Sequence, residues 1–112
     1  MNLSLLLILS DSGEKNQKTL EFLNKEFRSI KGSIQLLVYG TKEQLESFGD
    51  MTGQGVLLEK LDRTSVGAGR DADLFADAAG RMNGDYLTQM YGGDLWSEGA
   101  LSFVDKQKDK LA

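Results

Sequence analysis

Hydrophobic and polar residues follow two patterns in turn along this chain. Residues 3–9 are almost all apolar and lack polar alternation, which is typical of a strand covered on both faces of a parallel sheet. From Leu20 to Ile30 apolar residues recur at spacings of three and four, the spacing of one face of an amphipathic helix. Asp11 or Ser12 is placed to cap this helix. The beginning of the chain therefore predicts a strand followed by a helix.

The next part of the chain repeats the alternation with shorter elements. Residues 34–39 have the apolar, β-prone character of a second strand. Thr41 and Gln44 have the capping-box spacing, which opens a short helix that runs through Phe48. Residues 54–61 contain a third apolar run between a glycine-rich turn and a polar stretch, so a third strand is expected there.

Three further elements are expected in the remainder. Small and apolar residues at spacings of four and three predict a helix over residues 66–82 that lies close to a sheet. Residues 86–90 predict a fourth strand, and residues 96–110 a last helix. The predicted inward face of the first of these helices consists of Ala68, Ala72, Phe75, Ala79 and Met82.

The order of elements predicts the fold class. Strands separated by helices favour an α/β, three-layer Rossmann-like sheet of about four mostly parallel strands, with helices on both faces. A chain of 112 residues is enough for one such domain, spanning 1–112. Ligands of these sheets gather at the carboxyl ends of the strands. The loops expected at that edge are residues 10–12, 39–41, 62–65 and 91–94.

Composition excludes several kinds of chemistry. The chain has neither Cys nor His, so disulfides, thiolate metal sites and histidine general bases are absent from it. Its formal net charge of −4 gives no broad attraction to nucleic acid or to an anionic membrane, although a local basic pocket for phosphate remains open. The apolar run at residues 5–9 is too short to span a bilayer and lacks the flanks of a signal peptide. We expect a cytoplasmic protein with no transmembrane segment.

Two segments in the second half carry a family resemblance. Residues 65–72 read Ser-Val-Gly-Ala-Gly-Arg-Asp-Ala, and Gly84-Asp85-Tyr86 then opens a strand that ends in the turn Tyr91-Gly92-Gly93-Asp94. This series resembles family 2 glycosyltransferases of the GT-A fold. In that family an arginine motif precedes a short helix, and a Gly-Asp/Glu-Tyr strand ends in a turn of the form Asp-small-Asp-Asp. The resemblance extends over nearly the whole chain, because the first two strands match the family's nucleotide-contacting elements.

The resemblance implies a GT-A-like domain that binds a nucleoside diphosphate sugar, with Mg²⁺ or Mn²⁺ as the cofactor. Arg70 falls at the motif's arginine and implies a diphosphate contact. Asp94 is the acid that remains in the turn and implies a metal ligand. Asp11 and Thr41 follow the first two strands and imply contacts to the base or the ribose.

Departures from the family pattern limit the implied activity. Tyr91 and Gly93 stand where the turn has carboxylates, which are the oxygen ligands that hard divalent cations prefer. The acceptor-binding half of the family also has no counterpart in this chain. We therefore expect a domain truncated relative to a full glycosyltransferase, inactive alone and active only as part of a complete enzyme. The alternative is a non-catalytic interaction or dimerisation module derived from such an enzyme, since an open sheet edge favours a homodimer.

The candidate residues also have structural interpretations. Asp94 and Asp11 suit helix N-caps, and an arginine near a helix start, such as Arg70, suits a solvated or ion-paired role. Asp71 and Asp73 form an Asp-x-Asp sequence, but residues two apart on a helix point about 200° apart, so these carboxylates are not expected to share a cation. Tyr91 and Trp96 suit either stacking on a ligand or ordinary packing.

Overall fold

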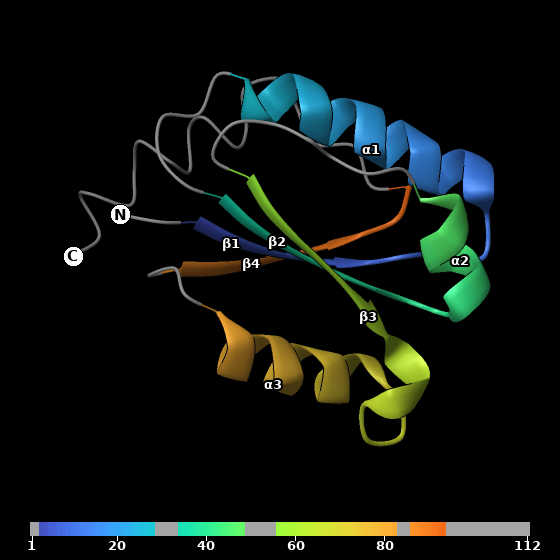
Figure 1. Ribbon diagram of the computed structural model, residues 1–112, viewed down its shortest axis with the longest axis vertical. Helices are drawn as coiled ribbons and strands as arrows, with labels where there is room; N and C mark the ends of the chain where they lie inside the picture. The colour runs from blue at the N-terminus through green and yellow to red at the C-terminus, as the bar shows by residue number, and fades with distance from the viewer. Residues whose placement is uncertain (1–2, 29–33, 49–55, 83–85, 94–112) are drawn as a thin grey trace.

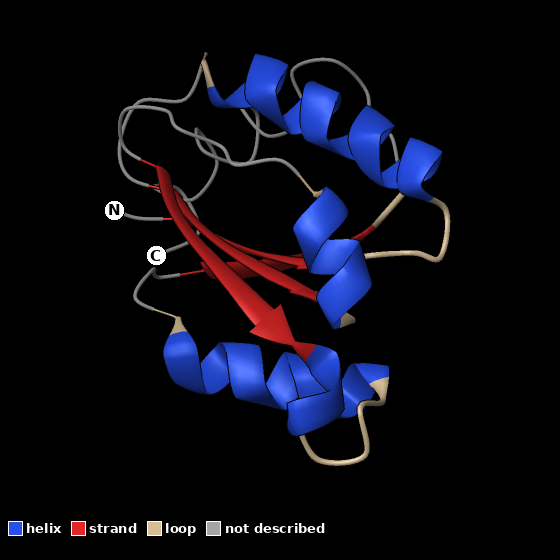
Figure 2. Ribbon diagram, turned by 45° about the vertical axis from the view of Figure 1, so that its right-hand side comes forward, coloured by secondary structure: helices blue, strands red, loops and turns tan. Residues whose placement is uncertain are grey.

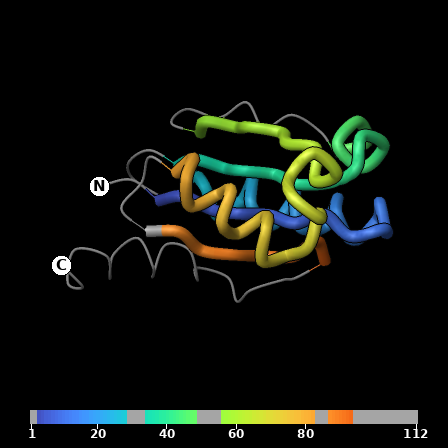
Figure 3. The backbone as a smooth tube through the Cα atoms, turned by 90° about the horizontal axis from the view of Figure 1, so that it is seen from below, coloured from blue at the N-terminus to red at the C-terminus, as the bar shows by residue number. Residues whose placement is uncertain are grey.

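A computed structural model describes residues 3–28, 34–48, 56–82 and 86–93 of the protein (Figure 1). Its sheet has four strands in the order β3-β2-β1-β4, and every neighbouring pair is parallel. The strands lie side by side when the molecule is seen from below (Figure 3). The predicted α/β fold class is confirmed. The strands are β1 (Leu3–Ile8), β2 (Ile34–Gly40), β3 (Val56–Asp62) and β4 (Tyr86–Tyr91).

Helices cover both faces of this sheet, as the sequence predicts (Figure 2). The helices α1 (Gly13–Phe27) and α2 (Lys42–Ser47) lie on one face, and α3 (Asp71–Arg81) lies on the other. A single 3-10 turn, η1 (Arg63–Ser65), follows β3 directly. No helix in the described ranges is long and apolar enough to cross a membrane.

The core is divided by the central strand β1. Its alternate residues Leu5 and Leu7 pack with Leu23 and Phe27 of α1. Leu6 points to the opposite face and belongs to a second cluster with residues of β2 and α3. Because side chains alternate along a strand, an uninterrupted apolar run is what a strand buried on both faces requires. All six residues of β1 are buried, which confirms that prediction.

The helix α3 differs from its prediction. It begins at Asp71 rather than at residue 66, because Gly67 and Gly69 have φ of +52° and +74°. Such left-handed residues form turns rather than a right-handed helix. The predicted inward face is also wrong, because Ala72, Phe75 and Ala79 are exposed. Leu74 and Ala78 are the buried pair, whereas Phe75 is 44% exposed.

The strand boundaries agree with the predictions to within a residue or two, whereas α1 ends at Phe27, earlier than the predicted end near Ile30. The capping box at Thr41 is confirmed, and the short helix predicted through Phe48 ends one residue earlier, at Ser47. The helix predicted over residues 96–110 lies outside the described residues, as do Ile30 and the start of the predicted third strand.

Candidate functional site

The carboxyl edge of the sheet is the candidate site. Because all four strands are parallel, the loops after β1, β2, β3 and β4 meet at one edge. The chain moves outward from β1 through β2 to β3, and then crosses back beneath the sheet along α3 to place β4 on the other side of β1. Ligands of open α/β sheets bind where the strand order reverses in this way. In this sheet the strand order reverses between β1 and β4.

The loop after β1 is organised by a buried asparagine. Asn16 is 3% exposed, and its Oδ1 accepts from the Ser10 amide at 2.9 Å while its Nδ2 donates to the Ser10 carbonyl at 2.9 Å. Ser12 is the N-cap of α1, since its Oγ accepts from the Lys15 amide at 3.3 Å. Of the two caps that the sequence offers, the structure uses Ser12. The carboxylate of Asp11 is exposed at the edge.

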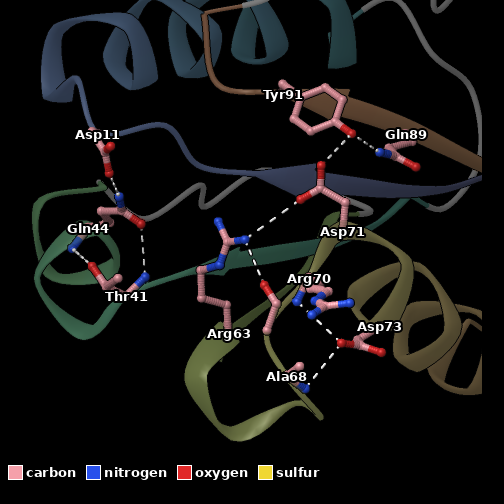
Figure 4. A network of polar contacts seen from close by, with 11 residues as sticks. Asp11, Thr41, Gln44, Arg63, Ala68, Arg70, Asp71, Asp73, Gln89 and Tyr91 are labelled. Atoms are coloured by element: carbon pink, nitrogen blue, oxygen red, sulfur yellow. Dashed lines mark hydrogen bonds and ion pairs between the residues drawn. The ribbon is translucent and has the colours of Figure 1, made fainter.

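Asp11 and Thr41 are brought together by Gln44. The Nε2 of Gln44 donates to Asp11 Oδ1 at 3.1 Å, and its Oε1 accepts from the Thr41 amide at 2.9 Å (Figure 4). Thr41 Oγ1 in turn accepts from the Gln44 amide at 3.3 Å, which completes the capping box of α2. Two residues that the sequence assigns to one site therefore lie in one hydrogen-bonded group.

Arg70 lies at the start of α3 with its side chain exposed. The turn before it is held by Asp73, whose Oδ2 accepts from the amides of Ala68 at 3.1 Å and Arg70 at 3.3 Å. An arginine side chain has no acceptor, so this cap involves only the backbone of Arg70. Within the described ranges no side chain pairs with its guanidinium, which is left available to a ligand.

A second polar group at this edge was missed by sequence reasoning. Tyr91 OH donates to Asp71 Oδ2 at 2.9 Å and accepts from Gln89 Nε2 at 2.7 Å (Figure 4). The other oxygen of Asp71 lies 3.6 Å from Arg63 Nη2, and that nitrogen also donates to the Gly69 carbonyl at 2.8 Å. These residues come from β4, α3 and η1, so no local pattern in the sequence joins them.

The prediction that Asp71 and Asp73 diverge is confirmed. The Asp71 carboxylate contacts Tyr91 and Arg63, whereas that of Asp73 points back to the turn before α3. In the described part of the chain no three His, Cys, Asp or Glu side chains are grouped so that they could hold a metal ion. Asp94, the predicted metal ligand, lies outside the described residues.

The turn after β4 is closed against α1. The Gly92 amide donates to the Ile8 carbonyl at 2.7 Å, and the Gly93 amide donates to Thr19 Oγ1 at 2.7 Å. A Cβ atom on Gly92 would lie 2.1 Å from Asn16 Oδ1, and Gly93 has a φ of +97°. Glycine is therefore required at both positions, and a carboxylate at either would need the turn to change its shape.

Two further acids at or near this edge are held in the charged state by their contacts. The hydroxyl and amide of Thr64 both donate to Asp62 Oδ1 and lower the pKa of Asp62. Beneath the sheet, the hydroxyl of Tyr39 donates to Asp77 Oδ2 at 2.5 Å and lowers the pKa of Asp77. Burial, reinforced by Asp77, raises the pKa of Tyr39 well above its ordinary range. The Asp62 contacts stabilise η1, and the Tyr39–Asp77 hydrogen bond joins α3 to β2.

Comparisons with protein-family models, with curated proteins and with solved structures found no match.

Proposed function

We propose that this chain is a glycosyltransferase-like domain that binds a nucleoside diphosphate sugar at the carboxyl edge of its sheet. The observation that carries the proposal is the strand order β3-β2-β1-β4, all parallel, with polar loops at the point of reversal. This is the order with which doubly wound nucleotide-binding sheets begin. Arg70 and Tyr91, which belong to the segments that resemble the family 2 motifs, lie at the same edge.

Asp11 and Thr41 are suited to the nucleoside. Asp11 uses one carboxylate oxygen for Gln44, so its Oδ2 is available to accept from ribose hydroxyls. Thr41 Oγ1 accepts from the Gln44 amide, and its hydroxyl proton remains for a ligand acceptor. Gln44 fixes the two side chains relative to each other before any ligand arrives. Pre-organised polar groups of this kind set the orientation of a ligand in its site.

Arg70 is suited to the diphosphate, because a guanidinium presents a planar fork of donors to phosphate oxygens. In a complete enzyme the bound donor would undergo displacement at its anomeric carbon, with the nucleoside diphosphate as the leaving group. We expect the present chain to bind the donor without transferring the sugar. The acceptor side has no counterpart among the residues that the resemblance covers, and Tyr91 and Gly93 stand in place of two of the turn's acids.

Isothermal titration of the protein with UDP, GDP, ADP and CDP tests this proposal. One of the four is expected to bind, and Asp11→Asn is expected to weaken it about tenfold through loss of a charge-assisted hydrogen bond. Glu14→Gln is the matched control, because Glu14 is an exposed acid near Asp11 whose nearest ion-pair partner is Lys18. The proposal would be contradicted if the heats of titration with all four nucleotides were equal to those of titration with buffer.

An interaction or dimerisation module is the second candidate. β3 is a terminal strand of the described sheet, and Leu57 on it is 53% exposed. The same strand carries Glu59 and Lys60, and charges on an edge strand oppose pairing with another chain. Nucleotide binding is therefore the better supported function. If light scattering showed a stable dimer and titration showed no nucleotide binding, the dimerisation module would become the better supported function.

A further inference from the structure

The described part of the turn after β4 does not offer the ligands of a divalent cation. Tyr91 stands where the family has its first acid, and its hydroxyl is already engaged with Asp71 and Gln89. The amides of Gly92 and Gly93 are bound by Ile8 and Thr19. Hard cations are held by carboxylate and carbonyl oxygens in an open arrangement, and these three positions have no free carboxylate. Within the described part of this edge, the positive charge that a diphosphate needs has to come from basic side chains.

Arg63 supplies such a charge at the same edge. It is the first residue of η1, directly after β3, and its side chain is 27% exposed. Its Nη2 is anchored by the Gly69 carbonyl at 2.8 Å and lies 3.6 Å from Asp71 Oδ1. Nε and Nη1 make no bond to any residue in the described ranges. The guanidinium is therefore held at one corner, with donors left over for an anion.

Asp71 joins this arginine to the turn. One of its oxygens is near Arg63 and the other accepts from Tyr91, so the guanidinium is tied to the position of the family's missing acid (Figure 4). A carboxylate at Tyr91 would repel Asp71, since like charges in contact are unfavourable. A phenol there instead donates a hydrogen bond. Tyr91, Asp71 and Arg63 thus form one group in which each polar contact is favourable.

We propose that Arg63 takes the place of a turn-bound divalent cation, so that this edge binds a diphosphate without metal. The inference rests on the proposed function and names the group that neutralises the ligand. Arg63 differs from Arg70, whose side chain is exposed and pairs with no described residue. An anchored guanidinium loses less freedom when it binds an anion than a freely moving one does. Arg63 is therefore the stronger of the two diphosphate contacts.

The test compares nucleoside diphosphate binding with and without metal. The protein is titrated with UDP, GDP, ADP and CDP in EDTA, and again in Mn²⁺. For the nucleotide that binds, we expect dissociation constants that agree within about twofold, which is under 0.5 kcal/mol at RT of about 0.59 kcal/mol. In EDTA, Arg63→Lys is expected to weaken binding about tenfold, because lysine keeps the charge but lacks the bidentate fork. Arg70→Lys is expected to weaken it less.

Arg28→Lys is the control, since Arg28 is an exposed arginine at the opposite end of α1 from the site. Urea unfolding of each variant shows whether it is folded. Binding that appears only in Mn²⁺ would overturn the metal-free inference and leave the proposed function standing. Binding in EDTA that is unchanged in a folded Arg63→Lys protein would overturn the assignment to Arg63. Binding in neither solution would overturn both the inference and the proposed function.

Discussion

Tyr39 is a fully buried tyrosine that joins the sheet to α3. Its hydroxyl donates to Asp77 Oδ2, the same oxygen that accepts from Arg81 Nε at 2.8 Å. Arg81 also lies 3.6 Å from Glu59 of β3, at ion-pair rather than hydrogen-bond distance. A buried hydroxyl needs a partner, and an ionised acceptor makes the hydrogen bond stronger. Tyr39 therefore stabilises the contact between α3 and the two strands β2 and β3.

Tyr39→Phe is expected to lower the free energy of unfolding by about 2 kcal/mol at pH 7. The pKa of Asp77 is lowered in the fold, so its contribution is present above about pH 4 and is lost as pH falls below that value. The pKa of Tyr39 is raised in the fold, so its contribution is present below about pH 10 and is lost as pH rises further. The difference between the two proteins should shrink at both extremes.

Urea unfolding of the wild type and Tyr39→Phe across this pH range measures the difference. Because both proteins share every other titrating group, subtraction isolates the Tyr39–Asp77 hydrogen bond. A difference that stayed constant from pH 3 to pH 11 would show that the hydroxyl contributes nothing through its ionised partner.

At the scale of the elements, β4 is packed closely against α1 and the loop after β1. Gly92 lies against Asn16 and the backbone of Ser10, where a Cβ would come within 2.8 Å of the Ser10 nitrogen. The family resemblance aligns Gly92 with the small residue of the turn and interprets Gly93 as a lost acid. The packing gives a structural reason for both glycines, since only glycine lets the end of β4 approach the loop after β1.

Gly92→Ala is expected to destabilise the protein by about 2 kcal/mol, because the new methyl group overpacks the contact between this turn and α1. Gly80→Ala is the matched control. Gly80 lies inside α3, and a Cβ there meets no atom within 4 Å, so alanine is expected to stabilise the helix by about 0.5–1 kcal/mol. Chemical denaturation of both variants measures the two effects. If Gly92→Ala had the same free energy of unfolding as the wild type, the close packing of this turn against α1 would be contradicted.

The elements differ in how far the sequence could predict them. β1 and α1 were predicted well because burial on both faces, or along one stripe, leaves a strong pattern in the residues themselves. The start of α3 was missed, since the left-handed conformations of Gly67 and Gly69 depend on the turn that Asp73 holds. The group of Arg63, Asp71 and Tyr91 could not be found at all. It exists only because α3 carries the chain from one side of β1 to the other.

At the scale of the whole molecule, the strand order determines where chemistry can occur. The reversal beside β1 brings the loops of Asp11, Thr41, Arg63 and Arg70 to one edge, although they are spread over much of the chain. The net charge of −4 gives no general attraction to an anionic ligand. We therefore expect recognition of a diphosphate to depend on the local arginines. A ligand held in this way should bind at the carboxyl edge and nowhere else on the molecule.

Mapping of amide chemical shifts in the ¹⁵N-labelled protein during titration with nucleoside diphosphates tests this central claim most directly. The amides of Asp11, Thr41, Arg63 and Arg70 are expected to shift together with a single dissociation constant. The amides at the opposite ends of the strands, such as those of Leu3, Ile34 and Val56, are expected to stay in place. Shifts confined to the amino ends of the strands, or no shifts with any of the nucleotides, would contradict the account.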